Sequence, residues 1–249
     1  MEKIARLLIV GGVHGDEPFG LRLVKRIKDV RPEGVEGVVA NMKALKKGVR
    51  YLETDMNRSF AVEAPVSIEE RRAEELMPKL MASDAVIDVH STRAQGTTCA
   101  ITVCEPNKLH LKIARHLNMK RLVIMPPSGS LVATCPDKAI SLEIATDKLG
   151  VFSTIFLLER LKTLNDVGDY DNRVLMVYKF VNRVSRKTLE RMKIDIGEIA
   201  NFKKLSTITV SKLGLNMSSE FVPIFYKRDE REDMAFTLVK KVGVIKDVK

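Results

Sequence analysis

The sequence lacks the features that mark membrane, secreted or repeat proteins. It contains no tryptophan, and its apolar runs are far too short to span a bilayer. The first residues show neither the apolar region nor the cleavage site of a signal peptide. No low-complexity tract or internal repeat is present. We therefore expect a cytoplasmic protein with no membrane partner.

Cysteine is also scarce, because the chain has only Cys99, Cys104 and Cys135. The three cysteines form no CxxC pair, and an odd number argues against a disulfide framework. They are most simply interpreted as buried thiols in a reducing compartment. Cys135 is a candidate pocket residue, but a structural role as a buried thiol is the simpler interpretation.

Aromatic residues make up only 5% of the chain, whereas its net charge is +10. Such a charge raises the question of nucleic-acid binding. The lysines and arginines are scattered among acidic residues, however, and few aromatic residues accompany them. A small anionic substrate explains the charge as well, so no nucleic-acid partner is expected.

The first two thirds of the chain alternate short apolar runs with amphipathic segments, which predicts a mainly parallel or mixed α/β sheet with helices on both faces. Residues 41–50 are expected to form a polar connection, and Pro78 to end or bend its helix. His110 and His116 are placed on a polar helix face, away from any ligand site. The expected strands cover residues 7–10, 37–40, 85–89, 98–103, 121–125 and 139–144, and the expected helices follow Pro18 and cover 67–80, 108–117 and 150–164.

Beyond residues 166–169 the pattern changes to short β-like runs without strong helices between them. We therefore predict one α/β domain over residues 1–168, which carries the candidate site residues described below, and a small β-rich domain over 169–249. Residues 186–199 are ambiguous and are assigned to a loop with a short helix. The β-like runs cover residues 174–184, 207–210, 220–226 and 236–242.

The segment Gly11-Gly12-Val13-His14-Gly15-Asp16-Glu17 follows the first apolar strand. Ligand crevices of open α/β sheets lie at the carboxyl ends of their strands, and this loop brings an imidazole and a carboxylate to that edge. A second histidine, His90, follows the apolar strand at 85–89. Two histidines and a glutamate are a common ligand set for catalytic zinc, so His14, Glu17 and His90 are candidate ligands for one Zn²⁺ per chain.

Each of these histidines, taken alone, is more simply explained as a core or surface residue. Asp88 precedes His90 by two positions and is a candidate outer partner for that imidazole.

Two other segments carry candidate catalytic groups. Residues 50–60 show no helical or strand periodicity and contain Arg50, Asn57 and Arg58. Such groups can stabilise an oxyanion or hold a carboxylate, although an isolated arginine is usually a solvated surface charge. Glu143 lies inside the apolar strand at 139–144. It is either an edge-strand carboxylate facing solvent or a partly desolvated general acid and base.

Four segments, GGVHGDE, RYLETDMNRSF, DVHST and SLEI, resemble in this order the aspartoacylase and succinylglutamate desuccinylase family, which is related to zinc carboxypeptidases. The resemblance spans residues 1–168. It implies a zinc carboxypeptidase-like fold and hydrolysis of an N-acyl amino acid. The roles that it implies are zinc binding by His14, Glu17 and His90, carbonyl polarisation by Arg50, carboxylate binding by Asn57 and Arg58, and acid–base catalysis by Glu143.

The chain also departs from the aspartoacylase pattern. Those enzymes have a Gly-Pro-Gln run after the catalytic glutamate, whereas Ile144-Ala145-Thr146-Asp147 follows here. They carry an arginine and a tyrosine before that glutamate, whereas residues 126–140 have Lys138 as their only basic residue. Tyr226 falls too early for a late family tyrosine, and Arg93 stands where relatives are often neutral. Specificity for an acidic side chain is therefore not supported.

The leading hypothesis is a zinc-dependent amidohydrolase for a small anionic N-acyl amino acid or a similar carboxylate-bearing amide. One alternative is a metallocarboxypeptidase that acts on short peptides. A less favoured alternative is a non-catalytic nucleic-acid-binding protein that retains the fold. The sequence leaves open the acyl group, the amino acid, the native metal and whether the chain forms a homo-oligomer.

Overall fold

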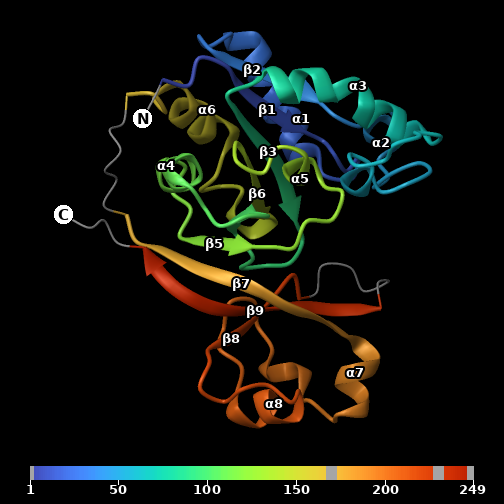
Figure 1. Cartoon of the computed structure of the whole chain (residues 1–249), viewed down its shortest axis with the longest axis vertical. Coiled ribbons are helices and arrows are strands. Elements are labelled where there is room, and N and C mark those ends of the chain that lie inside the picture. The colour runs from blue at the N-terminus through green and yellow to red at the C-terminus, as the bar shows by residue number, and fades with distance from the viewer. Residues whose placement is uncertain (1–2, 167–172, 227–232, 246–249) are drawn as a thin grey trace.

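The computed structural model describes residues 3–166, 173–226 and 233–245, and its strands join in one nine-stranded mixed sheet (Figure 1). The strand order is β2-β1-β3-β6-β4-β5-β7-β9-β8. Strands β2, β1, β3 and β6 run parallel to one another, whereas β4 is antiparallel to β6. The strands are β1 (Leu7–Gly11), β2 (Val35–Val39), β3 (Ala85–Thr92), β4 (Cys99–Thr102), β5 (Arg121–Ile124), β6 (Ala139–Ala145), β7 (Leu175–Ser185), β8 (Phe221–Ile224) and β9 (Met234–Ile245).

Helices cover both faces of the sheet, as the sequence predicts. Residues of α1, α4 and α6 pack in one apolar cluster with Ile9, Ile87 and Leu142, while residues of α3 and α5 pack with Leu8 and Val86 on the opposite face. The helices are α1 (Pro18–Val30), α2 (Met42–Lys47), α3 (Ile68–Ala82), α4 (Lys108–His116), α5 (Leu131–Thr134), α6 (Thr154–Lys162), α7 (Arg186–Arg191) and α8 (Thr207–Lys212).

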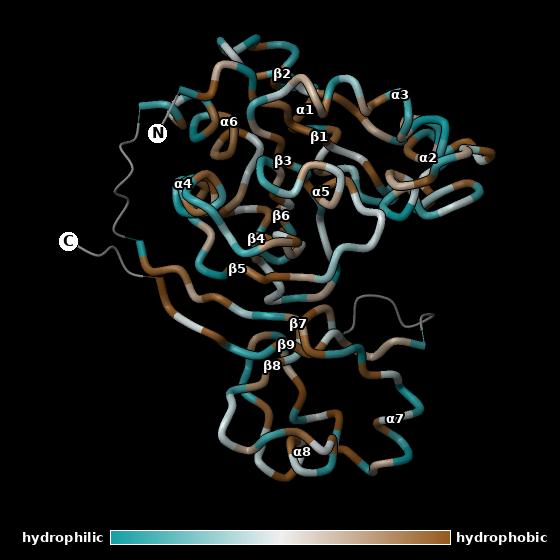
Figure 2. Tube along the Cα trace, in the orientation of Figure 1, coloured by the Kyte–Doolittle hydropathy of each residue, from teal (hydrophilic) through white to brown (hydrophobic). Residues whose placement is uncertain are grey.

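The central strands are hydrophobic because they are buried on both sides. Every residue of β1 and β6 is buried, and these strands stand out as apolar in Figure 2, whereas the outer helices alternate between hydrophobic and hydrophilic residues. A buried charged side chain within such a strand is therefore exceptional. None of the described helices is long and apolar enough to cross a membrane.

The C-terminal strands extend the same sheet. The long strands β7 and β9 pair with each other, β7 also pairs with β5, and β8 lies at the outer edge (Figure 1). A separate apolar cluster below them contains residues of α7, α8, β8 and β9. The boundary predicted at 168/169 lies outside the described residues, so the division into two domains stays a prediction.

One segment predicted as a connection and one predicted as a strand form helices instead. Residues 42–47 form α2, which the Asn41 side chain caps by accepting a hydrogen bond from the Ala44 N–H at 3.1 Å. Residues 207–212 form α8 instead of a strand, because Ser206 caps Thr209 and the helix buries Val210. The β-branched residues at 207–210 favour a strand, but the helix cap and the burial of Val210 decide the structure.

Pro78 does not end its helix, since α3 continues to Ala82. Pro78 lies on the exposed side of the helix, while Leu76 and Leu80 anchor the helix in the core. A capping box between Ser67 and Glu70 starts the helix. The ambiguous segment 186–199 contains α7 and a short 3₁₀ turn at Ile196–Glu198.

The two helical histidines are buried and do not lie on a polar face. His110 is 0% exposed and His116 is 2% exposed. His110 is the third residue of a capping box at the start of α4, where its Nδ1 accepts a hydrogen bond from the Asn107 N–H. Helix α4 is amphipathic, and both histidines lie on its buried side. The prediction was wrong because imidazole was treated as a polar, exposed group.

Candidate metal centre

The loop between β1 and α1 is held in place by close backbone contacts at its glycines. A Cβ atom at Gly11 would lie 2.5 Å from the Gly20 carbonyl group, and one at Gly15 would lie 2.3 Å from the backbone of Ala44 and Val49. Gly12 has a φ of 68°, in the left-handed region that favours glycine. The loop is thus fixed between α1 and α2, and its side chains have defined positions at the carboxyl end of β1.

Three of the predicted site residues meet at this edge. The Nδ1 atom of His14 lies 2.8 Å from Oε1 of Glu17, and the Nδ1 atom of His90 lies 3.1 Å from Oε2 of the same carboxylate. One potential ligand atom from each residue lies within 4.8 Å of the others. All three side chains are buried. His90 belongs to β3 itself, which continues to Thr92, and the Ser91 N–H fixes Glu17 by donating a hydrogen bond to Oε2 at 2.9 Å.

An aspartate stands behind each histidine. The Nε2 atom of His14 is 3.1 Å from Oδ1 of Asp55, and that of His90 is 2.8 Å from Oδ2 of Asp88. The aspartate partners favour a proton on each Nε2, which leaves each Nδ1 lone pair facing Glu17. Asp88 lies against the His90 imidazole, as the sequence predicts. Asp55 was not singled out in the sequence, although it lies in the irregular segment two positions before Asn57.

The charges around this cluster favour a cation between the three side chains. Burial alone would raise the pKa of Glu17, but His90 and His14 hold that pKa well below its ordinary value. Burial would lower the pKa of His90, yet Asp88 and Glu17 raise it well above its ordinary value. Two Nδ1 lone pairs that face a carboxylate repel it unless a proton or a metal ion lies between them.

The two aspartates behind the histidines also carry negative charge that favours a cation in the cluster. Burial would raise the pKa of Asp55, but the hydrogen bond from His14 and the charges of His14 and Arg50 hold it far below its usual range. Oδ1 of Asp88 is buried and has no hydrogen-bond partner among the described residues. Three carboxylates thus surround two imidazoles, and this donor set fits a divalent metal of the zinc type.

Arg50 lies beside the cluster, where it contacts two of its carboxylates. Its Nη1 atom is 3.7 Å from Oε1 of Glu17, and its Nη2 atom is 3.4 Å from Oδ2 of Asp55. The segment that carries Arg50 and Asp55 is tied down by Glu69, which is 0% exposed and accepts hydrogen bonds from the backbone of Leu52 and from the Asn41 side chain. The sequence alone does not single out Glu69.

Glu143 faces the same side of the sheet as His90, which it pairs with in register across β3 and β6. Strand β6 lies between β3 and β4, so the alternative of an edge-strand carboxylate in solvent is wrong. The side chain is only 6% exposed. It lines a cavity of about 90 Å³ together with Asp88, Asn57 and Arg58.

Asn57 and Arg58 form a 3₁₀ turn over Met56–Arg58, which Asp55 caps by accepting a hydrogen bond from the Asn57 N–H at 2.9 Å. Oδ1 of Asn57 accepts a hydrogen bond from the Leu131 N–H. The guanidinium of Arg58 donates to the Asn57 carbonyl oxygen and belongs to an exposed residue. The structure therefore brings all seven predicted site residues to one region.

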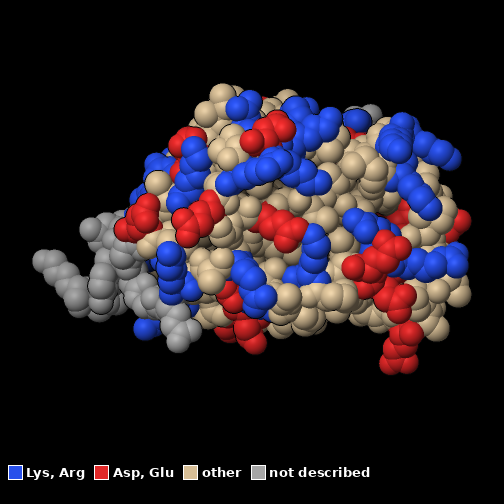
Figure 3. All heavy atoms as spheres, turned by 90° about the horizontal axis from the view of Figure 1, so that it is seen from above, with Lys and Arg blue, Asp and Glu red and all other residues tan. Residues whose placement is uncertain are grey.

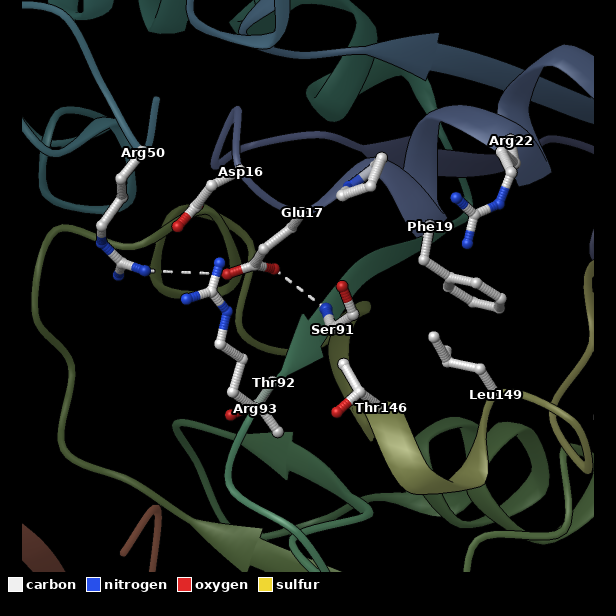
Figure 4. A pocket seen from close by; sticks show the side chains of 11 residues that line it. Asp16, Glu17, Phe19, Arg22, Arg50, Ser91, Thr92, Arg93, Thr146 and Leu149 are labelled. Carbon is white, nitrogen blue, oxygen red and sulfur yellow. Dashed lines mark hydrogen bonds and ion pairs between the residues drawn. The ribbon is translucent and has the colours of Figure 1, made fainter. Parts of the chain in front are cut away.

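A second cavity of about 130 Å³ lies against Glu17 (Figure 4). Its wall contains Arg22 and Phe19 from α1, Arg93 from the turn after β3, and Arg50. Phe19 and Leu149 of this wall belong to the apolar face that carries α1 and α6, whereas Val132 of the first cavity belongs to the face that carries α3 and α5. The metal cluster is thus flanked by a cavity on each side.

The remaining histidines and the cysteines do not belong to the metal cluster. His110 and His116 do not join the cluster that the described residues form. All three cysteines are free thiols; Cys99 and Cys135 are buried, while Cys104 is partly exposed. Burial and the negative charge of Glu143 raise the pKa of the Cys99 thiol, which keeps it uncharged. Cys135 packs in an apolar cluster, in agreement with a structural role.

Known proteins resemble this chain in sequence and in fold. A family model for the succinylglutamate desuccinylase/aspartoacylase catalytic domain matches residues 3–134. A probable aspartoacylase from a Nostoc species is 29% identical over 218 residues, which cover 74% of either chain. An N-acyl-aromatic-L-amino acid amidohydrolase (carboxylate-forming) from Xenopus laevis is 30% identical over 190 residues, 65% of this chain and 61% of that protein. The crystal structure of murine aminoacylase 3 has a TM-score of 0.75 at 20% identity and covers 98% of this chain and 97% of its own.

Proposed function

The chain belongs to the succinylglutamate desuccinylase/aspartoacylase family, and from that premise we propose that it is a zinc-dependent amidohydrolase. It removes the acyl group from a small N-acyl amino acid or a similar amide that bears a carboxylate. The relatives described above are a probable aspartoacylase and an N-acyl-aromatic-L-amino acid amidohydrolase. Their shared reaction type supports amide hydrolysis, while their different amino acids leave the side chain of the substrate open.

One observation carries the proposal. His14, Glu17 and His90 converge within 4.8 Å, and each imidazole is oriented by an aspartate at its other nitrogen. Structural zinc sites usually have four protein ligands, whereas catalytic sites keep a position open. A three-ligand cluster beside a cavity that contains a buried glutamate therefore supports a catalytic site over a structural one.

The proposed roles follow from where the side chains lie. Zinc held by His14, Glu17 and His90 would acidify the attacking water and polarise the scissile carbonyl. Glu143 accepts the proton of that water and returns it to the nitrogen of the leaving amine. Its position inside the sheet, next to His90 in register, suits this role, because it places the carboxylate beside the metal ligands.

The arginines and Asn57 handle the negative charges of the reaction. Arg50 contacts Glu17 and Asp55, so its guanidinium is held beside the metal ligands, where charge develops on the carbonyl oxygen. Asn57 and Arg58 share the cavity of Glu143, where they bind the carboxylate of the substrate by an amide and a guanidinium. The substrate is thereby oriented with its amide between the metal cluster and Glu143.

Metal analysis combined with a substrate panel tests this function. Protein purified without chelator should contain about one zinc per chain. The holoenzyme should hydrolyse N-acyl amino acids faster than dipeptides, and removal of zinc should abolish turnover. Absence of bound metal would refute the hydrolase assignment. Faster turnover of dipeptides would instead identify a metallocarboxypeptidase.

A nucleic-acid-binding role has less support. Figure 3 shows Lys and Arg side chains interspersed with Asp and Glu on the face that it presents, in place of a continuous basic patch. An electrostatic footprint for nucleic acid would gather one sign of charge on one face.

A further inference from the structure

We propose that Asn201, in the C-terminal part of the chain, is a positioning residue for the cavity that contains Glu143. It holds Phe225 in a strained backbone conformation, in which Phe225 forms part of the cavity wall. Of these two described residues, Phe225 lines the cavity and Asn201 does not, so Asn201 acts through Phe225. The consequence for catalysis rests on the proposed function, whereas the placement of Phe225 does not.

Phe225 directly follows β8 and brings the C-terminal part of the sheet to the cavity. It lines the cavity together with Glu143 from β6 and Asn57 from the 3₁₀ turn. Its side chain is buried and belongs to one apolar cluster with Cys99 of β4. The strand register places Cys99 beside Glu143. A displacement of Phe225 would therefore change the shape of the cavity close to the proposed general base.

The backbone of Phe225 is held from both sides by distant segments of the chain. Its φ is 60°, in the left-handed region that a bulky residue rarely adopts, and such strain persists only where surrounding contacts impose it. The Thr97 hydroxyl accepts a hydrogen bond from the Phe225 N–H at 3.4 Å. Oδ1 of Asn201 accepts one from the N–H of the next residue, Tyr226, at 2.8 Å.

The other end of the Asn201 amide joins two segments. Nδ2 donates a hydrogen bond to the Tyr226 carbonyl oxygen at 3.1 Å and another to the Gln95 carbonyl oxygen at 2.9 Å. Gln95 lies in the turn between β3 and β4, so one side chain connects this turn to the residue after Phe225. These bonds need one acceptor and two donors on a short planar group, which asparagine supplies.

The segment that carries Asn201 is itself fixed in place. The next residue, Phe202, donates a backbone hydrogen bond to the Pro223 carbonyl oxygen at 2.8 Å. The guanidinium carbon of Arg121 lies 4.3 Å from the centre of the Phe202 ring. Arg121 also donates to the Gly96 carbonyl oxygen at 3.3 Å, in the turn between β3 and β4. Asn201 is thus held against both segments that it joins.

Thiol labelling of Cys99 tests the placement of Phe225 without reference to activity, because Cys99 is 0% exposed and shares its apolar cluster. Zinc-loaded protein is treated with iodoacetamide under native conditions, and the modified cysteines are distinguished by peptide mass spectrometry. We expect Asn201→Ala to raise the labelling rate of Cys99 about tenfold. Cys135 is buried in a different apolar cluster, so its rate should change less than about twofold.

Steady-state kinetics tests the consequence for catalysis, at a temperature at which every variant is fully folded. With an N-acyl amino acid that the wild type hydrolyses, Asn201→Ala should lower kcat/KM about tenfold, because the cavity wall is no longer held in place. Phe225→Gly removes both the ring and the backbone strain. Asn201→Ala added to Phe225→Gly should therefore change kcat/KM less than about twofold.

Two further variants complete the test. Thr97→Val removes the other side-chain contact to the Phe225 backbone and should raise Cys99 labelling by a smaller factor than Asn201→Ala. Asn216→Ala is the matched control, because Asn216 is an exposed asparagine of the same region whose side chain accepts hydrogen bonds from Ser218. It should leave both labelling and kcat/KM unchanged.

Several results would overturn the proposal. They are an unchanged labelling rate of Cys99 in Asn201→Ala, an equal rise at Cys99 and Cys135, and the same rise in Asn216→Ala. Faster labelling with unchanged kcat/KM would make Asn201 purely structural, and an equal loss of kcat/KM with and without Phe225→Gly would exclude an action through Phe225. If the wild type turns over no N-acyl amino acid, the proposed function fails, while the labelling still decides whether Asn201 holds Phe225.

Discussion

The metal-site edge of the sheet and the C-terminal apolar cluster differ in what they bury. The carboxyl ends of β1, β3 and β6 bury His14, Glu17, Asp88, His90 and Glu143. Among the described residues from 173 onward, the only buried polar side chains are those of Thr209 and Thr237, and no charged side chain is buried. Both regions belong to one sheet, so the difference does not come from strand pairing.

Burial of charged groups is costly unless they are paired with other groups. The metal-site edge retains five such groups where apolar residues would pack at lower cost. The C-terminal cluster, by contrast, is a conventional apolar core. We infer that the first region is shaped by its chemistry and the second by stability, and four variants test this division.

Glu143→Gln should have the largest effect, on turnover alone. The substitution preserves the shape of the side chain but removes the proton acceptor, so kcat should fall about 10²–10⁴-fold. Zinc content and thermal stability should remain close to those of the wild type. Steady-state kinetics and metal analysis provide the measurement, with Glu159→Gln on the exposed surface of α6 as the control. Unchanged turnover would remove Glu143 from the mechanism.

Phe236→Ala should act on stability alone. Phe236 is 0% exposed and packs its ring against Tyr226 in the C-terminal cluster. Its removal should lower the free energy of unfolding by about 3–5 kcal/mol, as measured by urea denaturation. Zinc affinity and kcat of the folded protein should change less than about twofold.

The control for that variant is Val242→Ala, on the same strand, whose side chain is half exposed. It should cost less than about 0.5 kcal/mol. A loss of zinc affinity in Phe236→Ala would contradict the separation of the two regions.

Asp88→Asn should weaken the metal site without unfolding the protein. Asp88 accepts a hydrogen bond from Nε2 of His90 at 2.8 Å, and its charge favours a cation at the other nitrogen. Zinc affinity should fall about 10–100-fold in competition with a chelator of known affinity. Asp84→Asn is the matched control, because Asp84 accepts hydrogen bonds from the backbone of Ala5 and Arg6, away from the cluster. Equal losses in both variants would exclude a specific positioning role.

The smallest effect is expected for His110→Gln, which tests a buried histidine outside the site. Burial lowers the pKa of His110 in the folded protein. As the pH falls below about 6.5, the unfolded chain binds the proton first, so the histidine contributes stability at neutral pH that is lost on acidification. Glutamine can keep the capping box but does not titrate.

Urea denaturation at pH 7.5 and 5.5, with zinc in excess for both proteins, should show a smaller loss on acidification in His110→Gln than in the wild type. The difference should be at most about 1.4 kcal/mol, because pH 5.5 lies about one unit below the pKa of a histidine in the unfolded chain. An equal loss in the two proteins would mean that His110 does not link stability to pH.

Much of the fold could be predicted because its main strands are long and apolar enough to be interpreted only as buried strands. The strands that carry Gly11, His90 and Glu143 were all found, with ends shifted by a few residues. The errors concern short elements such as α2 and α8, whose caps at Asn41 and Ser206 decide the structure where hydrophobic periodicity is weak. The sequence also offered no means to place Glu143 in the sheet interior, because strand order depends on long-range pairing.

The same limit applies to the site. His14, Glu17 and His90 were identifiable as a candidate ligand set, because each comes after an apolar run and carries a ligating group. Their convergence is now visible in the structure, while their catalytic roles stay proposals. Asp55 and Glu69 were overlooked, since an aspartate in a loop and a glutamate at a helix start are common. Only the folded chain shows that one orients His14 and that the other holds the loop.

The pairing of β1, β3 and β6 also determines when the site can form during synthesis. These strands are neighbours in the sheet but are spread along the chain from Leu7 to Ala145. Contacts between such distant segments require long loops to close, which makes them slow to form. A nascent chain that has emerged only as far as His90 holds all three candidate ligands but lacks β6 beside them. We expect stable zinc uptake to follow, and not to precede, the emergence of residue 145 from the ribosome.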